Sequence, residues 1–69
     1  MNDKRRVQIR KGGDNWVDIL FKDITILETF RVFEPTGELV DVDGNTNFIA
    51  TSNPYKNNKG VLTIKIVLE

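Results

Sequence analysis

One arginine and one polar segment hold the residues of this chain whose types and spacing suit ligand binding. Arg31 is the only arginine beyond residue 10, and a guanidinium can bind a carboxylate or a phosphate through two parallel hydrogen bonds. The segment TSNPYKNNKG at 51–60 carries hydroxyls, amides, a tyrosine and two lysines. Loops with such side chains carry binding functions more often than packed strands do. These two regions predict a ligand-binding site made of Arg31, Ser52, Asn53, Tyr55 and Lys56.

Both features also have a plainer interpretation. Glu28, Glu34 and Glu38 lie near Arg31 in the sequence, and any of them could form an ordinary surface ion pair with it. The polar segment could equally be a surface connection between two strands. The tertiary structure must decide between a site and a set of unrelated surface groups.

Basic residues gather at the start of the chain. Half of its ten lysines and arginines lie within residues 1–12, namely Lys4, Arg5, Arg6, Arg10 and Lys11. Such a cluster could contact phosphates, so nucleic-acid binding is the alternative function. Eight of the ten acids lie within residues 13–45 and the net charge is zero, which argues against a broad nucleic-acid surface. A flexible basic tail over residues 1–5 is the plainer interpretation.

The residue types argue against catalysis and against a metal site. The chain has no cysteine and no histidine, so it lacks thiolate ligands, imidazole ligands and the usual proton shuttle. The stretch DVDGN at 41–45 resembles the front of a calcium loop, but Thr46 and Ser52 stand where that loop needs glycine and glutamate. We expect a hairpin turn there, no cofactor, no metal and no enzyme activity.

Alternating apolar residues predict the strands that would position these groups. The pattern indicates strands at 7–10, 16–21, 29–34 and 61–69, with a further one around Phe48. Pro35 and Gly37 predict one tight turn, and Asp43-Gly44 predicts a two-residue hairpin. The expected fold is one all-β domain over residues 1–69, with five to six short strands. An SH3-like barrel is the first choice, and a folded antiparallel meander is the other.

The phenylalanines are expected to supply most of the core. Phe30 and Phe33 are three residues apart, so a regular strand would point them to opposite faces. Arg31 would then share the face of Phe33. The closing stretch VLTIKIVLE has an apolar face and a single lysine, Lys65. If it lies at a sheet edge, it would favour pairing with a second copy.

Residues 23–64 resemble small proteins of phages and prophages of low-GC bacteria. The resemblance rests on the two glycine turns and on a set of residues around them: Phe30, Arg31, Phe33, Glu34, Phe48, Ala50, Pro54 and Tyr55. It implies a phage accessory protein that binds a host protein or sequesters a small nucleotide. It brings no catalytic activity with it.

The sequence therefore predicts a non-enzymatic binding protein that forms homo-oligomers. Its partner would be a host protein or a small nucleotide, with nucleic acid as the alternative and a structural role in the virion as a third possibility. No apolar run follows the basic start, so we expect a soluble cytoplasmic protein with no membrane segment.

Overall fold

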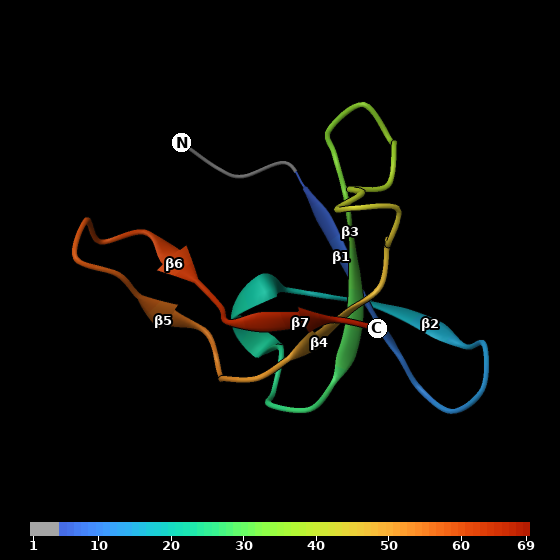
Figure 1. Ribbon diagram of the computed structural model, residues 1–69, viewed down its shortest axis with the longest axis horizontal. Coiled ribbons are helices and arrows are strands. Elements are labelled where there is room, and N and C mark those ends of the chain that lie inside the picture. The colour runs from blue at the N-terminus through green and yellow to red at the C-terminus, as the bar shows by residue number, and fades with distance from the viewer. Residues whose placement is uncertain (1–4) are drawn as a thin grey trace.

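The computed structural model describes residues 5–69, and its strands form two antiparallel sheets (Figure 1). The larger sheet has the strand order β2-β1-β3-β4-β7, and the smaller one pairs β5 with β6. The elements are β1 (Arg6–Arg10), β2 (Trp16–Ile19), the short 3-10 turn η1 (Phe21–Asp23), β3 (Thr29–Phe33), β4 (Phe48–Ala50), β5 (Tyr55–Lys56), β6 (Leu62–Thr63) and β7 (Ile66–Leu68).

The all-β class is confirmed, but the larger sheet does not close into the SH3-like barrel that was the first choice. Its edge strands, β2 and β7, pair only with β1 and β4 among the described residues. The structure is the folded antiparallel sheet that was the other expectation, with seven strands instead of five or six. No helix in residues 5–69 is long and apolar enough to cross a membrane.

The core lies against one face of the larger sheet. Its buried members come from β1, β3, β4 and the bend after η1: Val7, Ile9, Ile24, Phe30, Phe48 and Ala50. The half-buried side chains of Phe21, Val32 and Ile64 pack around this cluster. Because side chains alternate along a strand, the residues between the buried ones point to the opposite face. We call that opposite face of β2, β1 and β3 the outer face.

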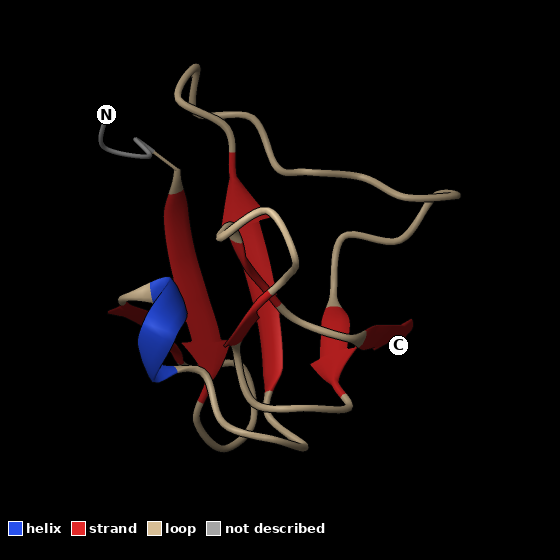
Figure 2. Cartoon of the chain, turned by 90° about the vertical axis from the view of Figure 1, so that its left-hand side faces the viewer, coloured by secondary structure: helices blue, strands red, loops and turns tan. Residues whose placement is uncertain are grey.

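The first predicted turn has the expected geometry. The N–H of Gly37 donates to the carbonyl of Glu34 over 2.8 Å, and the N–H of Glu34 donates to the carbonyl of Glu38 over 2.7 Å. Gly37 has a φ of 95°, which a side chain would strain. The connection from β3 to β4 then extends beyond the end of the sheet (Figures 1 and 2).

The stretch at 41–45 is a hairpin turn, as its Asp-Gly pair predicts. Asp43 and Gly44 both have positive φ, 53° and 83°, as a type I′ turn requires. Val42 and Asn45 exchange two backbone hydrogen bonds of 2.9 Å on either side of it. The Asp41 carboxylate accepts the N–H of Gly44 at 2.8 Å, so it closes the turn.

The prediction of one strand over residues 61–69 is wrong. The stretch divides at Ile64 and Lys65 into β6, which pairs with β5, and β7, which pairs with β4. The N–H of Lys65 donates to the hydroxyl of Ser52 at 3.1 Å, and the carbonyl of Lys65 accepts from the N–H of Thr51 at 2.8 Å. The stretch has a continuous strand pattern, but it forms two strands because its first half pairs with β5 and its second half pairs with β4.

Residues 51–60 contain a strand and a turn, and not only the polar loop that the sequence suggests. Tyr55 and Lys56 form β5, and residues 57–60 turn the chain back into β6. The Asn57 side-chain oxygen accepts the N–H groups of Lys59 and Val61 at 2.9 and 3.1 Å. The segment is thus a hairpin with an asparagine-stabilised turn.

Leu27 lies in a strained backbone conformation. Its φ is 73° and its side chain is 77% exposed, so burial does not offset the strain. Leu27→Gly should therefore raise the free energy of unfolding by about 0.5–1 kcal/mol, after the greater freedom of glycine in the unfolded chain is allowed for. The same change at Ile26, whose φ is not positive, should lower it. Chemical denaturation of both variants checks the prediction, and a loss of stability in Leu27→Gly would contradict it.

Candidate binding face: an arginine–aromatic row

The strand register places arginines and aromatics side by side on the outer face. Opposite Arg10 in β1 stands Trp16 of β2, and opposite Gln8 stands Asp18. On the other side of β1, Gln8 faces Arg31 of β3 and Arg6 faces Phe33. The neighbours of these residues along β1 and β3, among them Val7, Ile9 and Phe30, are buried on the core side.

Five of these side chains form one continuous row. The guanidinium of Arg31 lies 4.1 Å from the centre of the Trp16 ring and 5.3 Å from that of Phe33. At the two ends of the row, Arg10 lies 5.8 Å from the Trp16 ring and Arg6 lies 5.2 Å from the Phe33 ring. All four distances allow a cation–π contact. We call Arg10, Trp16, Arg31, Phe33 and Arg6 the arginine–aromatic row.

Arg31 occupies the middle of this row and is half-buried. Its Nε donates a hydrogen bond to the Gln8 side-chain oxygen at 2.9 Å. It forms no ion pair with a carboxylate in residues 5–69. The ion pair with Glu28, Glu34 or Glu38 that its sequence position made plausible is thus not formed. The expectation that Arg31 shares a face with Phe33 is confirmed.

The other three arginines each have an acidic partner. Arg5 pairs with Glu34 at 3.5 Å and Arg6 pairs with Asp18 at 3.2 Å, while Arg10 pairs with Glu69. The same holds for Lys11, whose Nζ lies 3.6 Å from Glu28. The acids of the middle and end of the chain therefore neutralise these four members of the basic cluster. Lys4, its fifth member, lies outside the described residues, as does most of the expected tail over 1–5.

Three carboxylates in these pairs have a lowered pKa. Hydrogen bonds from Gln8 and then Arg6 lower the pKa of Asp18, and hydrogen bonds from Arg10 and then Asn47 lower the pKa of Glu69. Partial burial raises the pKa of Glu28, but the hydrogen bond from the Thr25 N–H and the charge of Lys11 outweigh it, so the net shift is also downward. All three groups are therefore ionised at neutral pH.

These shifts predict that the fold loses stability in acid. A carboxylate whose pKa is lower in the folded state stabilises the fold above its unfolded pKa, 4.5 for Glu28, and the contribution disappears as the pH falls through the folded value. Glu28→Gln should therefore be less stable than wild type at pH 7, and the two melting temperatures should converge as the pH falls below 4.5. Melting curves across this range check it. A constant difference at every pH would contradict it.

Ser52 and Asn53, two residues of the predicted site, hold backbone groups in place. The Ser52 hydroxyl donates to the carbonyl of Asn53 at 3.0 Å and accepts the Lys65 N–H. The Asn53 side-chain oxygen accepts the N–H of Ile26 at 2.9 Å, across 27 residues of sequence. Both side chains therefore have structural partners, which a ligand would have to displace.

The Asn53 contact predicts a loss of stability on truncation. Asn53→Ala should lower the free energy of unfolding by about 1 kcal/mol, because the Ile26 N–H loses its acceptor. Asn58→Ala is the matched control, since Asn58 is exposed in the β5–β6 turn. Urea denaturation of both variants measures the difference. Equal stabilities would show that the Asn53 contact contributes nothing.

Tyr55 and Lys56 are not brought together with Arg31. They form β5, in the two-stranded sheet, which pairs with no strand of the larger sheet within residues 5–69. This hairpin lies at the far end of the molecule from the β1–β2 hairpin (Figure 1), and its neighbour Ile64 packs on the core side. Arg31 points to the outer face. The predicted site of five residues is thus spread over two faces.

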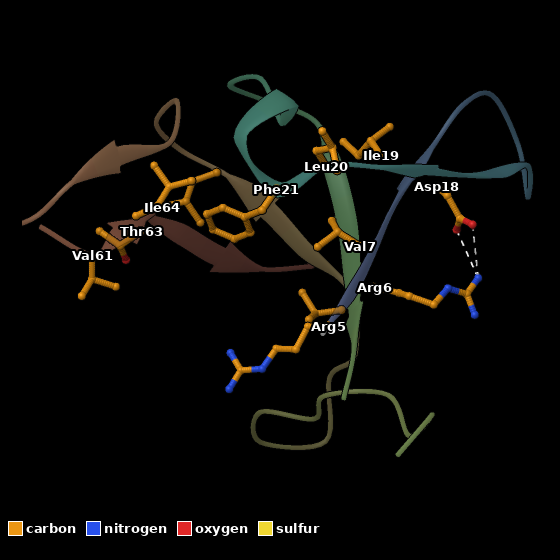
Figure 3. A pocket seen from close by; sticks show the side chains of 12 residues that line it. Arg5, Arg6, Val7, Asp18, Ile19, Leu20, Phe21, Val61, Thr63 and Ile64 are labelled. Atoms are coloured by element: carbon orange, nitrogen blue, oxygen red, sulfur yellow. Dashed lines mark hydrogen bonds and ion pairs between the residues drawn. The ribbon is translucent and has the colours of Figure 1, made fainter. Parts of the chain in front are cut away.

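A pocket of about 750 Å³ lies on the core side of the sheet, between β1, η1 and the β5–β6 hairpin. Figure 3 shows Phe21, Val7 and Ile64 around it. The polar residues of its lining are Arg5, Arg6, Asp18 and Thr63, and Arg6 and Asp18 pair with each other. Most of its lining is apolar: Val7, Ile19, Leu20, Phe21, Val32, Val61, Leu62 and Ile64. Neither Arg31 nor Tyr55 or Lys56 lines it, so it does not form the predicted nucleotide site.

In residues 5–69 no three acidic side chains gather closely enough to hold a metal ion. The outer face offers aromatic rings, hydrogen-bonding groups and the positive charge of Arg31, which has no acidic partner in residues 5–69. Comparison of the chain with protein-family models, with curated proteins and with solved structures found no match.

Four members of this face were not assigned to a site from the sequence: Gln8, Trp16, Asp18 and Phe33. The alternation in β1 indicates that Gln8 shares a face with Arg10, and the glycine turn at 12–13 predicts that β2 folds back beside it. The sequence does not predict the register that places Trp16 beside Arg10 and Arg31, because that register depends on where the turn places β2.

Proposed function

We propose that this chain is a non-enzymatic binding protein that docks on a partner protein through its arginine–aromatic row. The observation that carries the proposal is Arg31, the one arginine without an acidic partner among the described residues, stacked between Trp16 and Phe33. A partner carboxylate would supply the missing charge. The resemblance of residues 23–64 to phage proteins makes a bacterial host protein the expected partner.

The composition of the row suits a protein interface. Tryptophan, tyrosine and arginine dominate the residues that contribute most to the affinity of protein complexes. Stacking on Trp16 and Phe33 and the hydrogen bond to Gln8 fix the Arg31 guanidinium before binding. A group that is already ordered loses less entropy when the partner binds.

The geometry favours a protein over the two other ligand classes. A small nucleotide binds in a concave site; the pocket described above is lined mostly by apolar side chains, and Arg31, Tyr55 and Lys56 lie outside its lining. Nucleic acid needs several unpaired positive charges along one surface, but Arg5, Arg6, Arg10 and Lys11 are each paired with an acid.

Site-specific photo-cross-linking in a host extract tests the proposal. A photoreactive phenylalanine analogue at Thr29, which lies in β3 two residues before Arg31, should cross-link to one discrete protein. The same analogue at Val61, in the β5–β6 hairpin, should not. Adding Arg31→Ala to the Thr29 probe should abolish the cross-link. An undiminished cross-link in Arg31→Ala, or equal labelling from both positions, would reject the row as the binding face.

A further inference from the structure

The edge strand β7 presents an apolar strand with free backbone groups. Ile66, Val67 and Leu68 are 39%, 50% and 37% exposed, and β7 pairs only with β4 among the described residues. The opposite edge of the sheet differs, because β2 carries the charged Asp18, held by Arg6 and Gln8. Charged side chains on an edge strand discourage further pairing, and β7 has none within its bounds.

The hydrogen bonds of β7 show which of its backbone groups are free. The carbonyl of Lys65 accepts from Thr51, and the N–H of Glu69 donates to the carbonyl of Asn47. In an antiparallel strand the backbone groups of alternate residues point to opposite edges. The backbone N–H and carbonyl groups of Lys65, Val67 and Glu69 therefore point to β4. Those of Ile66 and Leu68 point to the open edge.

We propose that a second copy of this chain pairs with β7 in an antiparallel, two-fold symmetric manner centred on Val67. In this register Ile66 stands opposite Leu68 of the second copy, and these are the residues whose N–H and carbonyl groups are free. The two equivalent pairs form four hydrogen bonds. Val67 stands opposite its own copy, which brings apolar side chains together on both faces.

The charges at the two ends of β7 agree with this register. Lys65 of one copy stands opposite Glu69 of the other, and the pair occurs twice; the Glu69 carboxylate also binds Arg10 and Asn47 of its own copy. Lys65 has no acidic partner in the described part of the chain. Opposite charges across a strand pair stabilise it, and like charges oppose it. A shift by one residue would instead leave the free backbone groups unmatched.

The pairing would join the two larger sheets into one continuous sheet. The two-fold axis runs perpendicular to the sheet through the Val67 pair, so the arginine–aromatic rows of both copies face the same side. A dimer built this way presents two equal binding faces. The pairing through β7 does not depend on which partner those faces bind.

Engineered cysteines test the register directly, because the chain has no cysteine of its own. Val67→Cys should form a disulfide-linked dimer under mild oxidation, since residues directly opposite in such a pair have Cα atoms about 4.5–5.5 Å apart, within the range a disulfide needs. Ile66→Cys should not cross-link. Position 66 stands opposite Leu68 of the second copy, so the two engineered cysteines would be two residues apart along the strand. Val61→Cys, exposed on the hairpin, is the control for random collision. Equal cross-linking at all three positions would overturn the proposal.

Sedimentation equilibrium measures the association without a cross-link. Wild type should be a dimer, and Leu68→Pro, which removes a free N–H at the open edge, should be a monomer that still unfolds cooperatively. Lys65→Glu should raise the dimer dissociation constant about tenfold or more, because two attractive charge pairs become repulsive. Lys59→Glu at the hairpin turn should leave it unchanged. A monomeric wild type, or a dimer unaffected by Leu68→Pro and Lys65→Glu, would refute pairing through β7.

Discussion

Phe30→Ala is expected to remove a large part of the stability of the protein. Phe30 is 2% exposed and packs against Phe48, with ring centres 5.7 Å apart. Truncating a buried phenylalanine costs about 3–5 kcal/mol, because apolar contacts are lost and a cavity remains. A chain of 69 residues has a total stability of about 3–10 kcal/mol. One substitution thus removes a large part of the whole.

Phe33→Ala is the matched control on the same strand. Phe33 is half-buried on the outer face, so the same truncation should cost about 1–2 kcal/mol and leave the fold intact. Circular dichroism and urea denaturation of both variants measure the contrast. If Phe30→Ala were as stable as Phe33→Ala, the core would not be the one described here.

Arg31→Ala is expected to weaken partner binding about thirtyfold or more while the fold persists. The estimate follows from the loss of about 2 kcal/mol or more that central tryptophan and arginine residues of interfaces show on truncation. Removing Arg31 takes away the charge offered to the partner and the group that joins Trp16 to Phe33. Titration of the cross-linked partner against both proteins measures the change.

Two further arginine variants separate charge from geometry. Arg31→Lys keeps the charge but loses the planar group that stacks on the rings, so its affinity should fall between those of wild type and Arg31→Ala. Arg5→Ala removes an arginine outside the row, which pairs with Glu34, and should leave the affinity unchanged. An equal loss in Arg5→Ala would point to general electrostatic attraction, not to the row.

The residues that the sequence placed correctly are those whose conformation depends on near neighbours. Asp43-Gly44 forms its turn through positive φ values that these residue types tolerate. Phe30 and Phe33 lie on opposite faces of the sheet because successive side chains of a strand alternate. The same alternation puts Arg31 on the face of Phe33. Each of these conclusions needs only the chemistry of a few adjacent residues.

What only the tertiary structure decided involves residues far apart in the chain. Arg10 pairs with Glu69 across 59 positions. This ion pair and those of Arg5, Arg6 and Lys11 neutralise most of the basic cluster. Lys65 and Ser52 hold the point at which the closing stretch divides, 13 positions apart. Arg31 meets Trp16 because β1 pairs with both β2 and β3. Such contacts depend on the register between strands, which local residue preferences do not encode.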